Sequence, residues 1–275
     1  MYIPENAILV VSFGTSSEQT GITAIQQLES RIQDAFPSYA IYRAWTSERI
    51  RKKLLEQENQ KINSVSEALR QMKEDGIRNI IVQPTFVIDG EENQRMRNEA
   101  LIYAGEFSSM KFGAPLLGDA VDAKMTATAV SQTISANISY TKDDLIVFMG
   151  HGAALDTLIH EANDWKSDPN AMYTLVDNFL QQSGHSNMVL RLMNKPGSID
   201  EILALASSLQ PRKIILVPFM IVAGRHAKKD MAGKQESSWA SRLTSAGYSV
   251  QCVMKGLGEY DTIQEIFSEH IKRIL

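Results

Sequence analysis

The chain has 275 residues, 44% of them hydrophobic and 22% charged, which is ordinary for a globular protein with a packed core. A net charge of −4 gives no general attraction to nucleic acid or to anionic membranes, so neither is expected as a partner. The sequence shows no secretory signal and no apolar run of membrane-spanning length, and its single cysteine cannot form an internal disulfide, so we expect a cytoplasmic protein.

Short apolar runs rich in β-branched residues alternate along the chain with longer segments that carry apolar residues at helical spacing. The short runs predict strands over Ala7–Ser12, Ala40–Ala44, Asn79–Gln83, Lys111–Ala114, Leu145–Met149, Met188–Leu192, Lys213–Val217 and Ser249–Met254. The longer segments predict helices that include Gly21–Ala35, Ser64–Glu74, Asp119–Asn137 and Ser198–Leu209. This alternation favours an α/β fold with parallel sheets that are covered by helices on both faces.

Two predicted helices begin with a similar local pattern. Ser64 and Glu67 have the spacing of a capping box, in which each side chain bonds to the backbone N–H of the other residue. The run Ser198-Ile199-Asp200-Glu201 repeats the opening of this pattern in the second half of the chain. We therefore expect Ser198 to take the same place at its helix start as Ser64 does.

An internal repeat sets the predicted domain organisation. The run Val82-Gln83-Pro84-Thr85-Phe86-Val87-Ile88-Asp89-Gly90-Glu91-Glu92 aligns with Leu216-Val217-Pro218-Phe219-Met220-Ile221-Val222-Ala223-Gly224-Arg225-His226. A second alignment, at nearly the same offset, matches Val11-Ser12-Phe13-Gly14 with Met149-Gly150-His151-Gly152. One duplication explains both alignments. It predicts two similar doubly wound domains that face a central cleft, residues 1–125 and 126–259, with a C-terminal helix over 260–275 packed back on the first.

Two histidines and a carboxylate follow predicted strands at places that the repeat relates. His151 lies between two glycines, His226 follows Gly224-Arg225, and Glu92 is aligned with His226. In open α/β sheets ligands bind beyond the carboxyl ends of the strands. Two imidazoles and a carboxylate suit a divalent ion of the first transition row, and three protein ligands leave positions open for a substrate. The alternatives are a structural histidine in a tight turn and two polar residues that favour a helix start.

The run Gly14-Thr15-Ser16-Ser17 after the first strand has the composition of an anion cradle at a helix start. It matches neither of the glycine-rich nucleotide-binding patterns. We therefore expect no nucleotide cofactor.

Several motifs, in order along nearly the whole chain, resemble those of the anaerobic sirohydrochlorin cobaltochelatase family of class II chelatases. They are Leu9-Val10-Val11-Ser12-Phe13-Gly14-Thr15-Ser16, Ala44-Trp45-Thr46-Ser47, Gly90-Glu91-Glu92, Phe148-Met149-Gly150-His151-Gly152, Ala223-Gly224-Arg225-His226-Ala227, Asp230-Met231-Ala232 and Lys255-Gly256-Leu257-Gly258-Glu259. The resemblance implies insertion of Co²⁺ into sirohydrochlorin or a related tetrapyrrole without ATP, in anaerobic cobalamin biosynthesis. Association into homo-oligomers stays open.

The resemblance also implies roles for individual residues. His151, His226 and Glu92 would bind the metal and assist in removing the pyrrole protons. The macrocycle would lie in a slot between the domains, with Arg49, Arg51 and Arg225 as donors for its carboxylates. The residues expected to line this slot are Ser12, Phe13, Gly14, Thr15, Phe86, Gly90, Gly150, Gly152, Phe219 and Met220.

Two positions differ from the pattern that is usual in that family. Phe86 stands where a histidine is usual, and Asn194 stands where a glutamate is usual. These differences support a second hypothesis, a tetrapyrrole- or haem-binding protein that keeps the cleft without the insertion chemistry. The two imidazoles and the carboxylate also suit Fe²⁺, Ni²⁺ or Zn²⁺.

Overall fold

The computed structural model describes residues 4–16, 21–153, 168 and 170–275. The chain forms two compact units, of which the first contains Met1–Gly118 and Gln264–Leu275 and the second Asp119–Ile263. The boundary therefore precedes helix α5 (Ala120–Asn137), whereas the boundary predicted from the sequence lies within this helix, between residues 125 and 126. The first unit includes most of the last helix, α9 (Asp261–Lys272), where His270 lies 3.1 Å from the Ala114 carbonyl oxygen.

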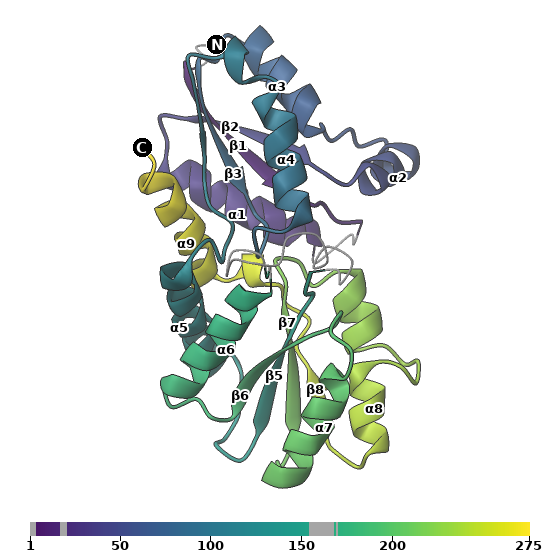
Figure 1. The fold of residues 1–275 in the computed structure, drawn as a ribbon. Helices are drawn as coiled ribbons and strands as arrows, with labels where there is room; N and C mark the ends of the chain where they lie inside the picture. The colour runs from purple at the N-terminus through teal and green to yellow at the C-terminus, as the bar shows by residue number, and fades with distance from the viewer. Residues whose placement is uncertain (1–3, 17–20, 154–167, 169) are drawn as a thin grey trace. The chain divides into compact units, whose positions relative to one another are not determined.

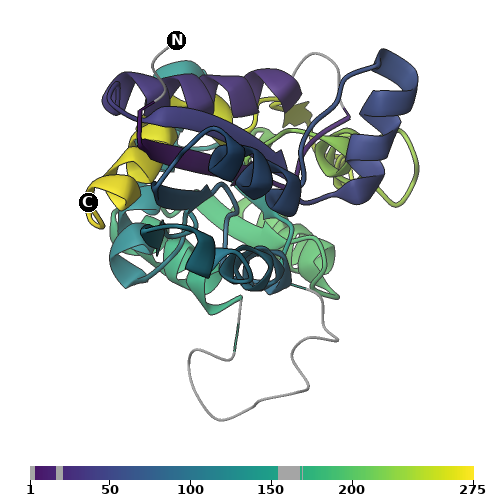
Figure 2. The same ribbon diagram turned by 90° about the horizontal axis from the view of Figure 1, so that it is seen from above.

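The first unit contains one parallel sheet with the strand order β2-β1-β3-β4. Helices α3 and α4 bury apolar side chains against one face of this sheet, and α1 lies on the other face (Figures 1 and 2). The strands are β1 (Asn6–Ser12), β2 (Ala40–Trp45), β3 (Asn79–Pro84) and β4 (Ser109–Phe112). The helices are α1 (Gly21–Ala35), α2 (Glu48–Glu58), α3 (Val65–Glu74), α4 (Glu91–Leu101) and the short η1 (Ala104–Glu106).

The second unit repeats this plan with the strand order β6-β5-β7-β8. Helices α7 and α8 cover one face of its sheet, and α5 and α6 pack together on the other (Figure 1). The strands are β5 (Leu145–Gly150), β6 (Met188–Leu192), β7 (Ile214–Phe219) and β8 (Val250–Cys252). The remaining elements are α6 (Ala171–Gln182), α7 (Ser198–Leu209), η4 (Ala227–Met231), α8 (Trp239–Ser245) and η5 (Leu257–Glu259). The predicted α/β fold class is confirmed.

The strand register reproduces the repeat that was found in the sequence. Val11 pairs with Pro84 in the first sheet, and Met149 pairs with Pro218 in the second. Both pairs are those that the sequence alignments relate. Gly14 and Gly152, which are aligned as well, have φ angles of +97° and +79°, so the chain leaves the central strand of each unit through the same left-handed conformation.

Local signals predicted one helix start correctly and another incorrectly. Ser64 and Glu67 form the predicted capping box of α3. At α7 the residue before the helix is Gly197, with φ +81°, and no side chain caps the helix. The expectation that Ser198 takes the place of Ser64 is therefore wrong. Ser198 is the first residue of the helix, and its hydroxyl is buried.

Candidate metal-binding and catalytic site

Two histidines meet at the carboxyl edge of the second sheet. The central strands β5 and β7 are neighbours, and their last residues, Gly150 and Phe219, are paired. His151 directly follows β5, and His226 lies at the start of η4, which follows β7. The centroids of the two imidazole rings are 4.9 Å apart, and the ring planes cross at 74°. The fold thus brings together two of the three residues that the sequence suggested as metal ligands.

The backbone of the glycine turn fixes the orientation of His151. Its Nδ1 lies 2.8 Å from the carbonyl oxygen of Gly152 and 3.3 Å from the side-chain amide of Asn194. Because a carbonyl oxygen only accepts hydrogen bonds, we place the ring proton on Nδ1. The lone pair on Nε2 is then available to bind a metal or to accept a proton.

Asp230 orients the second histidine in a similar way. Its Oδ2 lies 2.7 Å from Nδ1 of His226, four residues earlier, across the single π-type turn η4. The carboxylate accepts the Nδ1–H and leaves the lone pair of Nε2 available. A carboxylate in this place is the usual second partner of a metal-binding imidazole. Asp230 belongs to the sequence motif Asp230-Met231-Ala232, which by itself predicts no role for it, although its four-residue spacing from His226 could have indicated one.

The environment of His151 keeps its imidazole neutral. Burial lowers the pKa of His151 below the ordinary histidine value of 6.5, and the nearby His226 lowers it further. The Gly152 carbonyl and Asp230 act against this shift. A neutral imidazole at neutral pH is the form that binds metals and accepts protons.

This shift predicts that the protein loses stability as the pH falls below 6.5. Between pH 6.5 and the lower pKa of the folded state, the unfolded chain binds a proton at His151 and the folded chain does not. Lowering the pH through this range therefore favours unfolding. We expect the Tm of the wild type to fall more steeply between pH 7 and pH 5 than that of His151→Asn. His185→Asn, which changes a histidine in the α6–β6 loop, serves as the control and should follow the wild type. Parallel curves for wild type and His151→Asn would contradict the assignment.

Phe13 is the most exposed of the predicted slot residues at the end of β1. Its side chain is 47% exposed, whereas Ser12 and Thr15 are buried. The Ser12 hydroxyl accepts a hydrogen bond of 2.8 Å from Thr85. At Gly14 a Cβ atom would come within 2.7 Å of the Trp45 ring, so the missing side chain leaves room for this buried indole. Ser17, the last residue of the suggested anion cradle, lies outside the described residues.

Glu92 lies in the first turn of α4, which begins after Gly90. Its side chain is 38% exposed and lies 3.7 Å from Arg95. Because Glu92 belongs to the first unit and the histidines to the second, its part in a common metal site stays a prediction. Among the residues that the structure describes, neither unit by itself groups three side chains of His, Cys, Asp or Glu into a metal site.

Most of the remaining predicted slot residues are buried. Phe86 packs partly buried against the core of the first unit, and Met220 against that of the second. Gly150 and Gly152 lie against Leu192, with Tyr173 beside Gly150. Phe219 is fully buried, and its ring makes edge contacts with Phe148 and Tyr173. The expectation that Phe219 contacts a ligand is therefore corrected, because its ring is part of the core of the second unit.

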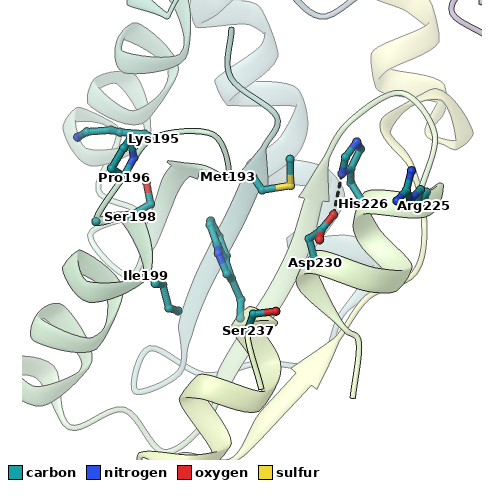
Figure 3. A pocket seen from close by; sticks show the side chains of 11 residues that line it. Met193, Lys195, Pro196, Ser198, Ile199, Arg225, His226, Asp230 and Ser237 are labelled. Carbon is teal, nitrogen blue, oxygen red and sulfur yellow. Dashed lines mark hydrogen bonds and ion pairs between the residues drawn. The ribbon is translucent and has the colours of Figure 1, made fainter. Parts of the chain in front are cut away.

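The three arginines that were suggested as donors have different surroundings. Arg51 forms an ion pair of 3.3 Å with Glu67, and Arg49 lies on the exposed side of α2. Arg225 precedes His226 and lines a cavity of about 530 Å³ in the second unit. Figure 3 shows this cavity between the β6–α7 connection and the turn that carries His226. Met193, Ser198, Asp230, Ser237 and Trp239 also contribute to its lining.

A close backbone contact holds the loop that leads to His226. Leu257 N and Gly258 N donate to the carbonyl oxygens of Met220 and Ile221, at 2.7 and 2.9 Å. At Gly256 a Cβ atom would lie 2.4 Å from the Ile221 oxygen and 2.8 Å from the Ala223 nitrogen. Only glycine fits there without moving the loop before His226.

Gly256→Ala is accordingly expected to lower the free energy of unfolding by about 1–3 kcal/mol, because the methyl group overpacks a rigid backbone contact. Chemical denaturation measures this change. Gly105→Ala is the matched control, since a Cβ atom at Gly105 would meet nothing within 4 Å. Equal free energies of unfolding for Gly256→Ala and wild type would show that the backbone at position 256 tolerates a methyl group.

The family described as cobalt chelatase (CbiK) matches residues 6–275. The chain belongs to the CbiK family of cobalt chelatases. The resemblance drawn from the sequence motifs is thereby confirmed, and with it the expectation of a metal chelatase. The sirohydrochlorin cobaltochelatase of Salmonella typhimurium is 29% identical over 98% of this chain and 97% of that protein. The sirohydrochlorin cobaltochelatase CbiKC of Nitratidesulfovibrio vulgaris is 28% identical over 97% of this chain and 89% of that protein.

Solved structures of other chelatases share the fold. SirB from Bacillus subtilis with Fe³⁺ gives a TM-score of 0.64 at 12% identity, over 98% of this chain and 94% of that one. CbiX, described as the terminal enzyme of sirohaem biosynthesis in denitrifying bacteria, gives 0.55 at 14% identity, over 98% and 100%. Among the helices that the structure describes, we find none with the length and apolar character needed to cross a membrane.

Proposed function

We propose that this chelatase inserts Co²⁺ into sirohydrochlorin, with His151 and His226 as the groups that bind the metal and accept the pyrrole protons. The observation that carries the proposal is the paired geometry of the two imidazoles. The rings are 4.9 Å apart, and each has its Nδ1 engaged, by Gly152 in one case and by Asp230 in the other. Both Nε2 lone pairs are therefore available at the same edge of the sheet.

The reaction exchanges one metal ion for two protons. Co²⁺ enters the ring, and the two pyrrole N–H protons leave as the four nitrogens bind the metal. A neutral imidazole suits both halves of this exchange, because it binds borderline metals of the first transition row and accepts protons near neutral pH. Partial burial lowers the pKa of His151 and so favours this neutral form. On the side of His226, the carboxylate of Asp230 lies 2.7 Å from Nδ1 and orients the ring.

Glu92 is proposed as the third group, and the internal repeat supports this assignment. In the first unit Gln94 N donates to the Gly90 carbonyl at 3.1 Å, and in the second Lys228 N donates to the Gly224 carbonyl at 3.0 Å. Glu92 and His226 each lie two residues after the glycine of such a turn. Each half of the duplication thus presents one polar side chain at the carboxyl edge of its sheet, and a carboxylate there serves as an additional metal ligand or proton acceptor.

The site chemistry and the curated relatives support sirohydrochlorin as the substrate and cobalamin biosynthesis as the setting. The relatives from Salmonella typhimurium and Nitratidesulfovibrio vulgaris both carry the name sirohydrochlorin cobaltochelatase. The hypothesis of a haem-binding protein without insertion chemistry rested on Phe86 and Asn194, and the names of the relatives give it no support. The Phe86 ring packs against the core of the first unit.

The test is the metal-insertion reaction itself. Purified protein is mixed with sirohydrochlorin and Co²⁺ in the absence of ATP, and the change in visible absorption is followed against a protein-free reaction. We expect acceleration that is proportional to protein concentration. The double variant His151→Asn/His226→Asn, compared at equal concentration, controls for nonspecific effects of protein. A wild-type rate equal to the protein-free rate at several metal concentrations would overturn the proposal.

A further inference from the structure

The cavity beside His226 contains a buried hydroxyl that has no partner. Ser198, at the start of α7, is 2% exposed, and its Oγ has no hydrogen bond among the described residues. Ser198 lines the cavity together with His226, and Figure 3 shows the two on opposite sides of it. A buried polar group without a partner costs stability, so its presence at a cavity indicates that a ligand completes its hydrogen bonding.

The charges around Ser198 allow this ligand to be an anion. Two acidic residues lie in the first turn of α7, but Asp200 forms an ion pair of 2.8 Å with Arg242. Glu201 forms ion pairs with both Lys195, at 2.9 Å, and Arg191, at 3.0 Å. Arg191, which also pairs with Asp177 at 2.9 Å, remains an ion-pair partner of Glu201 when the exposed Lys195 ammonium turns towards a ligand. The twelve-residue helix adds the positive end of its dipole on the same side.

Apolar side chains, beside the polar Arg225, Asp230 and Ser237, complete the lining and suit the edge of a ring. Met193, Ile199 and the buried Trp239 contribute carbon surface to the cavity. The volume of about 530 Å³ lies within the range of ordinary ligand pockets. A ligand that occupies this cavity therefore combines a flat apolar part near His226 with an anionic group near Ser198.

We propose that this cavity binds one carboxylate-bearing pyrrole of the tetrapyrrole, and that its carboxylate accepts hydrogen bonds from Ser198 Oγ and Lys195 Nζ. This assignment rests on the proposed function, because it takes the substrate to be a tetrapyrrole with peripheral carboxylates. It places one edge of the ring in the second unit, directly beside the imidazole of His226.

Ser198→Ala and Lys195→Gln test the assignment through the binding of metal-free sirohydrochlorin, which requires no turnover. Each variant is expected to raise the Kd for the ring about tenfold, because a hydrogen bond to a charged group is lost. The KM for sirohydrochlorin should rise to the same extent, whereas kcat and the KM for Co²⁺ stay unchanged. Ser198→Ala should not lower the Tm, since the hydroxyl that it removes has no partner.

Matched controls come from the same unit. Ser207→Ala makes the same change at an exposed position of α7, and Lys142→Gln removes an exposed charge before β5. Both should bind the ring as the wild type does. With the peripheral carboxylates esterified, wild type, Ser198→Ala and Lys195→Gln should bind equally, because the anionic group that distinguishes them is gone.

The outcomes separate this inference from the proposed function. If the wild type inserts cobalt and both variants bind sirohydrochlorin as tightly as it does, only the cavity assignment is overturned. If the wild type binds the ring without inserting cobalt, while the variants bind it more weakly, the assignment stands and the proposed function falls. If the wild type does not bind the ring, both are overturned.

Discussion

His151→Ala and His226→Ala are each expected to lower the rate of cobalt insertion by about 10²- to 10⁴-fold. Each substitution removes an Nε2 lone pair from the pair of rings that lie 4.9 Å apart. The remaining imidazole can still bind a metal ion weakly, but it cannot also accept a second proton. The expected defect is therefore mainly in kcat at saturating sirohydrochlorin, with a smaller effect on binding of the ring.

Single-turnover mixing of enzyme, sirohydrochlorin and Co²⁺ measures this defect directly. His185→Ala is the matched control, because it removes a histidine of the same unit that lies in the loop before β6. It should leave the rate unchanged. Far-ultraviolet circular dichroism establishes that each variant is folded. A folded His151→Ala or His226→Ala variant with the wild-type rate would show that its imidazole takes no part in the insertion.

The strands and the duplication could be predicted from the sequence because both depend on local patterns. The central strands are buried on both faces, so they are continuous apolar runs bounded by glycines and polar residues. The aligned pairs Val11 with Met149 and Pro84 with Pro218 occupy equivalent positions in the two ladders. The meeting of His151 and His226 follows from the same topology, because neighbouring parallel strands end at one edge.

The errors arise where the environment, rather than the residue type, decides the role. Phe219 was expected in a ligand slot because it is aromatic and ends a strand, but its direction along the strand places it in the core. Ser198 was expected to act as Ser64 does, but Gly197 adopts a left-handed conformation and takes the place before the helix. The role of Asp230 depends on a contact across a π-type turn, and its four-residue spacing from His226 alone does not establish that contact.

Asp230→Asn is expected to weaken the affinity of the site for Co²⁺ by about 10- to 100-fold. The carboxylate accepts the Nδ1–H of His226 at 2.7 Å and thereby directs the Nε2 lone pair outward. An amide in its place also offers an NH₂ group, which favours the opposite tautomer and turns a proton towards the metal. Asp230→Glu keeps the charge and should recover part of the affinity.

The dependence of the insertion rate on Co²⁺ concentration, together with a Co²⁺ titration of the ring-free protein, separates this positioning role from a general loss of structure. Asp143→Asn removes an exposed carboxylate before β5 in the same unit and should change neither quantity. Equal Co²⁺ affinities for wild type and Asp230→Asn would show that Gly152 and the protein backbone suffice to orient the histidines. A selective loss of Co²⁺ affinity would instead show that the two imidazoles of the site are oriented by different groups. His151 is then oriented by the carbonyl of its own glycine turn, and His226 by the charged side chain of Asp230.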